Sequence, residues 1–143
     1  MNDLTRNLKA KERTHEAALR ELSSGYKSSH WSWWEILQIT GLGKTSTSRE
    51  YAIRDLEEAR AYLENKTLRA HLLELCDALL SLDSHDAEKM MGYPDNLKFC
   101  SCMTLFLAAD SKYPTFREVL EKYFEGKQER RTLYILKRQE QDG

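Results

Sequence analysis

The stretch TLRAHLLELCDALL, residues 67–80, decides the fold class of this chain. Its apolar residues recur every three or four positions, and charged residues fall between them. The apolar set is Leu68, Leu72, Leu75, Cys76, Leu79 and Leu80. Residues with this spacing share one face of a helix, so the stretch predicts an amphipathic helix whose apolar face joins a core.

Helix signals continue on both sides of this stretch. Residues 3–22 have helical spacing, and Asp55 is placed to cap a helix that starts at residue 56. Residues 96–109 follow Asp95, a second capping aspartate, and are apolar on nearly every side, which predicts a central helix.

Further signals complete the expected set of helices. Thr115–Glu118 has the form of a capping box, and residues 130–139 predict a last helix. Residues 30–39 are too few for periodicity to separate a helix from a strand, and we favour a helix. We expect an all-α single compact domain over residues 1–143, with about six to eight helices and no repeat. Its core spans about residues 4–136, and residues 137–143 form a flexible tail.

Composition excludes several classes of protein. Charged residues make up 31% and hydrophobic residues 41% of the 143, the balance of a soluble globular domain. The longest apolar run, residues 103–109, is far shorter than the roughly 20 residues that span a bilayer. The chain begins without a secretory leader, so we expect a cytoplasmic protein that does not enter a membrane.

The cysteine count and the net charge exclude further kinds of binding site. Three cysteines are too few and too oddly spaced for a disulfide framework or a zinc cluster, so we expect no metal site and no cofactor. A net charge of −1 argues against dedicated nucleic-acid binding. Glu57 and Glu58 lack a distinctive partner in sequence, and we expect them on a solvated face. The oligomeric state stays open.

Residues 38–48, QITGLGKTSTS, invite comparison with the nucleotide-binding phosphate loop. That loop requires a glycine five residues before the glycine of its Gly-Lys-Thr, and Gln38 stands there instead. It also requires a strand before it, which the helical pattern does not supply. What remains is a Gly41/Gly43 turn with hydroxyl residues, Ser46 and Ser48 among them, before an expected helix start that can attract an anion.

Four blocks of sequence together resemble one family. They are KSSHWSWWEILQ (27–38), GLGKTSTSREYAI (41–53), EARAYLENKTL (58–68) and YPDNLKFCSCMTLF (93–106). In this order they are similar to the domain-of-unknown-function family 1810, small bacterial and fungal proteins, over about residues 4–136. The chain departs from the family pattern at Ser32, Leu37, Asn65-Lys66 and Cys102.

The resemblance implies an all-α fold with a pocket, and it implies no particular reaction. The matching positions include Ser29, His30, Trp31, Trp33, Gln38, Gly41, Gly43, Ser48, Tyr51, Asp95, Lys98 and Ser101. The family's overall plan is distantly similar to that of families that cleave N-glycosidic bonds in ADP-ribose-like or riboflavin-precursor compounds, which is an analogy of fold alone.

Two groups of residues in these blocks offer chemistry. Trp31 and Trp33 beside His30 can form a stacking wall with a proton donor or acceptor, or they can be core anchors around a buried histidine. Asp95 and Lys98 share a helix face with Ser101 one turn on. They can serve as a base with a phosphate contact, or as a helix cap with an ion pair.

We therefore expect a small-molecule site that takes a phosphate-bearing, nucleotide-like ligand, such as an ADP-ribose-like compound or a sugar phosphate. If the protein is an enzyme, it is a hydrolase of N-glycosidase type with His30 and Asp95 as its catalytic residues. The expected ligand-binding residues are Ser29, Trp31, Trp33, Gln38, Gly41, Gly43, Ser46, Ser48, Tyr51, Lys98 and Ser101. The alternative is a protein-interaction module without chemistry, which docks a partner through its tryptophan-rich segment.

Overall fold

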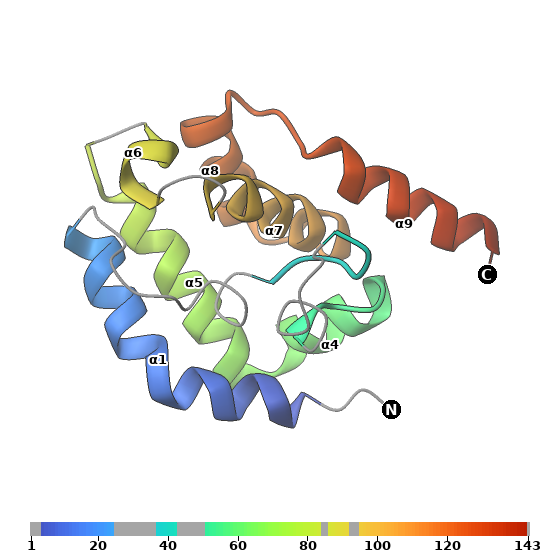
Figure 1. Cartoon of the computed structure of the whole chain (residues 1–143), viewed down its shortest axis with the longest axis horizontal. Helices are drawn as coiled ribbons and strands as arrows, with labels where there is room; N and C mark the ends of the chain where they lie inside the picture. The colour runs from blue at the N-terminus through green and yellow to red at the C-terminus, as the bar shows by residue number, and fades with distance from the viewer. Residues whose placement is uncertain (1–3, 25–36, 43–50, 84–85, 92–94, 143) are drawn as a thin grey trace.

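The computed structural model describes residues 4–24, 37–42, 51–83, 86–91 and 95–142, and it confirms an all-α fold in one domain. The helices are α1 (Thr5–Ser24), α4 (Leu56–Glu64), α5 (Lys66–Leu80), α6 (Ala87–Met91), α7 (Asp95–Ala109), α8 (Pro114–Phe124) and α9 (Arg130–Asp142). Figure 1 shows α7 in the middle of the molecule, with α4, α5 and α8 around it and α1 along the outer side of α5.

The pair α4–α5 forms as the sequence predicts. Asp55 Oδ1 accepts a hydrogen bond of 2.8 Å from the backbone N–H of Glu58, which confirms the expected cap of α4. Asn65 ends α4 and caps α5 through the N–H of Leu68 at 3.1 Å. Five of the six residues that predicted the amphipathic helix are buried, and Leu80 is partly buried.

Helix α7 is the central helix, as its sequence predicts. All eight residues from 99 to 106 are buried. Phe106 links two neighbouring helices, because its ring lies 5.2 Å from that of Tyr62 on α4 and 5.9 Å from that of Phe116 on α8. A helix buried all round needs neighbours on every side, which explains why the other helices surround it.

Helix α1 packs against α5 through a pair of imidazoles. The rings of His15 and His71 stack with centroids 3.8 Å apart. His15 Nε2 also lies 3.3 Å from a carboxylate oxygen of Glu74. The two helices therefore meet through a polar contact as well as through apolar packing.

Glu58 is buried, so the expectation that it lies on a solvated face is wrong. Its side chain is only 2% exposed, and its carboxylate lies 3.2 Å from Arg6 Nη2 and 3.2 Å from Arg54 Nε. Arg6 also donates to the carbonyl of Ala52 at 3.3 Å. A buried carboxylate needs such partners, and they come from α1 and from the segment before α4, which sequence spacing alone does not reveal.

Three helix boundaries differ from expectation. Helix α8 starts at Pro114 after Tyr113, which makes no side-chain cap bond, so the expected capping box at Thr115 is wrong. Proline is favoured at a first helical position because its φ is already helical and its missing N–H is not needed there. Leu37–Ile39, the described end of the 30–39 segment, is not helical. Helix α9 continues through residues expected to form a flexible tail, and Gln139 donates to Arg54 O at 2.7 Å.

Candidate functional site

The segment 37–42 brings together three residues that the sequence analysis assigned to the site. Ile39 and Ile53 form an isolated parallel bridge, with Ile53 N donating to Gln38 O at 2.9 Å and Thr40 N donating to Ile53 O at 2.8 Å. The bridge places Gln38 and Gly41 beside the 51–54 segment that starts with Tyr51. Gln38 and Tyr51 are both partly buried.

Gly41 is required where it stands. Its φ is +102°, in a region that L side chains rarely adopt. A Cβ built on it would lie 3.3 Å from Cδ1 of Ile135 on α9, a tight contact. The segment therefore passes closely under α9, as Figure 1 shows for the teal residues.

Ser101 and Lys98 lie on α7, as predicted, but Ser101 points into the protein. Its residue is 0% exposed. Its hydroxyl lies 3.1 Å from Leu97 O and 3.3 Å from Glu129 Oε1, two acceptors that compete for its one proton. Lys98 is partly buried in the first turn of the helix. Ser101 is therefore shielded from solvent. Its hydroxyl is linked to the start of α9 by the contact with Glu129.

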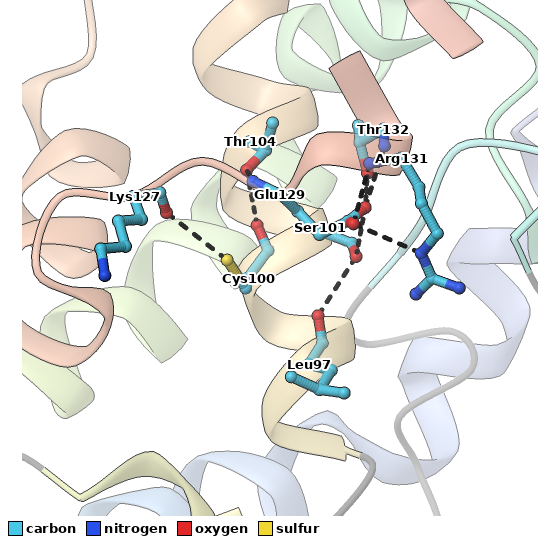
Figure 2. Close-up of polar contacts among 8 residues, drawn as sticks. All are labelled: Leu97, Cys100, Ser101, Thr104, Lys127, Glu129, Arg131 and Thr132. Carbon is cyan, nitrogen blue, oxygen red and sulfur yellow. Dashed lines mark hydrogen bonds and ion pairs between the residues drawn. The ribbon is translucent and has the colours of Figure 1, made fainter. Parts of the chain in front are cut away.

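Glu129 is the residue that the sequence analysis missed. It precedes α9, and its carboxylate accepts hydrogen bonds from the backbone N–H groups of Arg131 and Thr132, both at 2.9 Å. It also accepts from the Thr132 hydroxyl at 2.7 Å, and Arg131 Nε lies 3.4 Å away. Figure 2 shows this side chain between α7 and the first turn of α9. Glu129 is thus the N-cap of α9 and the link from α9 to Ser101.

The charge state of Glu129 follows from these contacts. Burial acts to raise the pKa of its carboxyl, but the hydrogen bonds from Thr132 and Arg131 and the charge of Arg131 outweigh it and lower the pKa below the usual value. The carboxylate is therefore ionised at neutral pH, close to the positive end of the α9 dipole.

A second contact ties the same loop to α7. The Thr104 hydroxyl donates to Cys100 O at 2.8 Å and accepts from Glu129 N at 2.8 Å. Cys100 Sγ donates to Lys127 O at 3.6 Å. Burial and the nearby charge of Glu129 raise the pKa of the Cys100 thiol to about 11, against a lowering by Thr104. This thiol is therefore protonated and a poor nucleophile at neutral pH.

The remaining assignments lie outside what the structure describes. Ser29, His30, Trp31, Trp33, Gly43, Ser46 and Ser48 belong to segments that are not described, and of Asp95 only the backbone is described. In the described part, α9 and the residue before it lie near both groups of assigned residues, because Glu129 contacts Ser101 and Ile135 lies beside Gly41. Within the described ranges, no helix is long and apolar enough to cross a membrane.

Comparisons with known proteins agree with this architecture. A sequence profile described as "Protein of unknown function (DUF1810)" matches residues 1–136. The crystal structure of the conserved hypothetical protein Rv1873 from Mycobacterium tuberculosis is similar, with 36% sequence identity and a TM-score of 0.92. The match covers 94% of this chain and 96% of that one. None of the curated proteins compared with the chain matches it.

Proposed function

We propose a function for this chain, which belongs to the family described as protein of unknown function (DUF1810). In this proposal it binds a phosphate-bearing, nucleotide-like small molecule, such as an ADP-ribose-like compound or a sugar phosphate. Hydrolysis of that ligand, of N-glycosidase type, is a second and separable part of the proposal. The site combines the tryptophan-rich segment, the Gly41 turn and the first turn of α7.

The observation that carries the proposal is the position of Lys98. This lysine is partly buried in the first turn of α7, a helix whose next eight residues are buried. The positive end of the helix dipole lies at that turn, so a cation there is unfavourable unless negative charge offsets it. Asp95 stands three residues before Lys98 in the sequence, the spacing of an ion pair on a helix. A ligand phosphate would supply more negative charge, and Lys98 would gain a charge-assisted hydrogen bond from it.

The Gly41 turn supports the proposal from the other side. Its backbone is held by the neighbouring Ile39–Ile53 bridge, and Ile135 lies close on the side where a Cβ of residue 41 would point. The chain runs from this fixed turn directly into Lys44 and the hydroxyl residues that include Ser46 and Ser48. A fixed glycine turn followed by hydroxyls and a lysine suits recognition of an anion by backbone N–H groups.

In the proposed chemistry, Trp31 or Trp33 stacks on the base or sugar, and Ser46, Ser48 and Lys98 hold polar or anionic groups. His30 or Asp95 transfers the proton that hydrolysis requires. The site lies in a reducing cytoplasm, in keeping with Cys76, Cys100 and Cys102, all of which are buried free thiols. The proposed binding and hydrolysis use no metal ion.

Thermal denaturation with candidate ligands tests binding. Nucleotides, ADP-ribose and sugar phosphates are added at increasing concentration. A true ligand at 100 times its Kd adds about 2.7 kcal/mol to the free energy of unfolding. For a domain of this size that raises Tm by roughly 8 °C. Lys98→Ala is expected to remove the part of the shift that comes from this site, whereas Lys137→Ala, which changes an exposed lysine on α9, leaves the shift as it is. An equal shift in both variants contradicts the proposed site.

Hydrolysis is tested separately, by chromatography of the ligand after incubation with the protein. His30→Ala and Asp95→Asn are expected to stop product formation while the ligand still raises Tm. If the ligand binds and stays intact with the unaltered protein, the hydrolysis part is wrong and the binding part stands.

The alternative function, a protein-interaction module, is favoured by one specific observation. Leu133 is 40% and Tyr134 63% exposed on α9, and Leu97 is 41% exposed on α7. Exposed large apolar side chains on helices are available to a partner protein, and they would add to the tryptophan-rich segment as the docking surface. This function predicts that no small molecule in the screen shifts Tm. It also predicts that Leu133→Ser with Tyr134→Ser reduces partner binding without loss of stability.

A further inference from the structure

A cavity of about 310 Å³ lies where the end of α4, the start of α5 and the turn between α7 and α8 meet. It shares no residue with the site proposed above. Its lining includes Arg60, Glu64, Arg69, Asp110, Lys112 and Tyr113. This volume is at the lower end of the range for small-molecule sites. The cavity can therefore hold a compact ligand.

Two arginines in the lining are held in place by helix ends. Arg60 Nε donates to the carbonyl of Ala109, the last residue of α7, at 3.0 Å. Arg69 Nη1 donates to the carbonyl of Leu63, near the end of α4, at 3.1 Å. Carbonyls at helix ends lack partners within the helix, so each bond also completes a helix.

Each anchor uses one of the five N–H groups that a guanidinium carries. The other N–H groups of both arginines belong to side chains that line the same cavity, and each anchor restricts the positions that its side chain can take. A charged group that is already oriented loses less conformational entropy when a ligand binds. Helix capping explains one bond for each arginine, but it does not explain why both arginines line one cavity.

The charges in the cavity favour an anion. The lining holds three cations, Arg60, Arg69 and Lys112, against two carboxylates, Glu64 and Asp110. Asp110 is already engaged by Lys112, through the backbone N–H at 3.0 Å and Nζ at 3.6 Å. The balance of charge in the lining is therefore positive by one unit.

We propose that this cavity binds the phosphate group of a small phosphorylated compound. Arg60 and Arg69 donate to the phosphate oxygens, and Glu64 accepts a hydrogen bond from a hydroxyl of the same ligand. Two guanidiniums from different helices suit a group with three charged oxygens better than a planar carboxylate, which one guanidinium can satisfy. This inference goes beyond the proposed function and does not depend on it.

Titration calorimetry with the full chain tests the proposal, with inorganic phosphate, a hexose phosphate and succinate as probes at constant ionic strength. Each phosphate is expected to fill this cavity with one molecule per chain, the hexose phosphate more tightly and succinate more weakly. A second hexose phosphate belongs to the site around Lys98 and is lost in Lys98→Ala. Binding is expected to weaken from pH 7.5 to pH 5.5, because the second pKa of a phosphate ester is about 6. Succinate binding as tight as phosphate, or no binding of any probe, overturns the proposal.

Matched variants locate the site. Arg60→Gln and Arg69→Gln are each expected to weaken phosphate binding by roughly tenfold or more, which is the loss of one charge-assisted contact. Arg138→Gln removes the same charge from the exposed end of α9 and is expected to leave the Kd unchanged. Equal Kd values for all three variants overturn the proposal. Lys98→Ala is expected to remove only the hexose phosphate bound at the site proposed above, and Arg60→Gln only the one bound in this cavity, which separates the two sites.

Because Arg60 and Arg69 also bond to helix-end carbonyls, their replacement affects folding as well as binding, and a readout without substitution is needed. In the unaltered protein labelled with nitrogen-15, the Nε–H signals of these two arginines are expected to shift together with saturation by phosphate. The signal of Arg138 serves as the internal control. Shifts of equal size at all three arginines indicate general screening by the salt and overturn the proposal.

Discussion

Replacing Glu129 by alanine removes one side chain that holds together α7, the following loop and the start of α9. Four polar groups of residues 131 and 132 lie within 3.4 Å of its carboxylate, and the hydroxyl of Ser101 lies 3.3 Å away. Ser101 keeps Leu97 O as an acceptor in the variant, and Arg131 is exposed enough to turn to water. The lasting damage therefore falls on Thr132 and on the free N–H groups of α9.

The magnitude follows from those two losses. Loss of an N-cap costs about 1 kcal/mol. Thr132 is 0% exposed, and a buried hydroxyl without its partner costs roughly 1–3 kcal/mol. We therefore expect Glu129→Ala to lower the free energy of unfolding by about 2–4 kcal/mol. Glu129→Gln keeps an acceptor oxygen and loses mainly the favourable charge at the helix dipole, so we expect a loss of about 1 kcal/mol.

Urea denaturation followed by far-UV circular dichroism measures both losses. Glu118→Ala on α8 is the matched control, since Glu118 is exposed, and its effect should stay within about 0.5 kcal/mol. The dependence of the free energy on urea concentration should keep the same slope in all variants. If Glu129→Ala is no less stable than Glu118→Ala, the carboxylate of Glu129 does not stabilise α9 as its cap.

The pH dependence gives an independent check on the same carboxylate. Its folded-state pKa lies below the ordinary glutamate value of 4.5, so the unfolded chain binds the proton first as pH falls. Its contribution to stability is therefore present above that value and is lost as pH falls through the lowered pKa. Glu129→Gln should show a shallower loss of stability between neutral pH and this acid range. If Glu129→Gln and the unaltered protein lose stability equally as pH falls, the carboxylate of Glu129 does not stabilise α9 in its ionised form.

Three more predictions concern single positions. The Cys100 thiol, with its pKa of about 11, should react with a thiol reagent at pH 8 about a hundredfold more slowly than an ordinary cysteine, and unfolding in urea should remove the difference. Gly41→Ala should lower the free energy of unfolding by about 2 kcal/mol, and Gly126→Ala by about 1 kcal/mol. Both glycines have a positive φ, but only at Gly41 would a Cβ lie in a tight contact, with Ile135. Asp55→Ala should lower stability by about 1 kcal/mol, and Asp55→Asn, which keeps a capping oxygen, by much less.

The sequence predicts the elements whose causes are local. Asp55 caps the helix that follows it, and the apolar spacing of residues 68–79 forms the buried face of α5. Both signals depend on residues within a few turns of one another, so no knowledge of distant partners is needed. Even here local rules compete, since Pro114 starts α8 before the residues that resemble a capping box.

The parts that sequence reasoning missed depend on distant partners. Glu129 meets Ser101 across 28 positions of the chain, and glutamate is not a preferred N-cap, so no local pattern singled it out. Ile39 became extended because Ile53 pairs with it, although its own segment fitted a helix equally well. The same holds for Arg60 and Arg69, whose shared cavity exists only because the end of α7 reaches α4.

The two proposed sites can be distinguished even though one rigid helix carries parts of both. Lys98 lies in the first turn of α7, whereas Arg60 binds the carbonyl of Ala109 at the other end. Any ligand that binds the folded chain raises Tm, so a thermal shift with a sugar phosphate does not say which end is occupied. If the two sites are independent, their effects on the free energy of unfolding add. Lys98→Ala and Arg69→Gln should then each remove a separate part of the shift, and the double variant should remove their sum. A double variant that loses no more than either single one would mean that the two ends bind a single ligand or act as one unit.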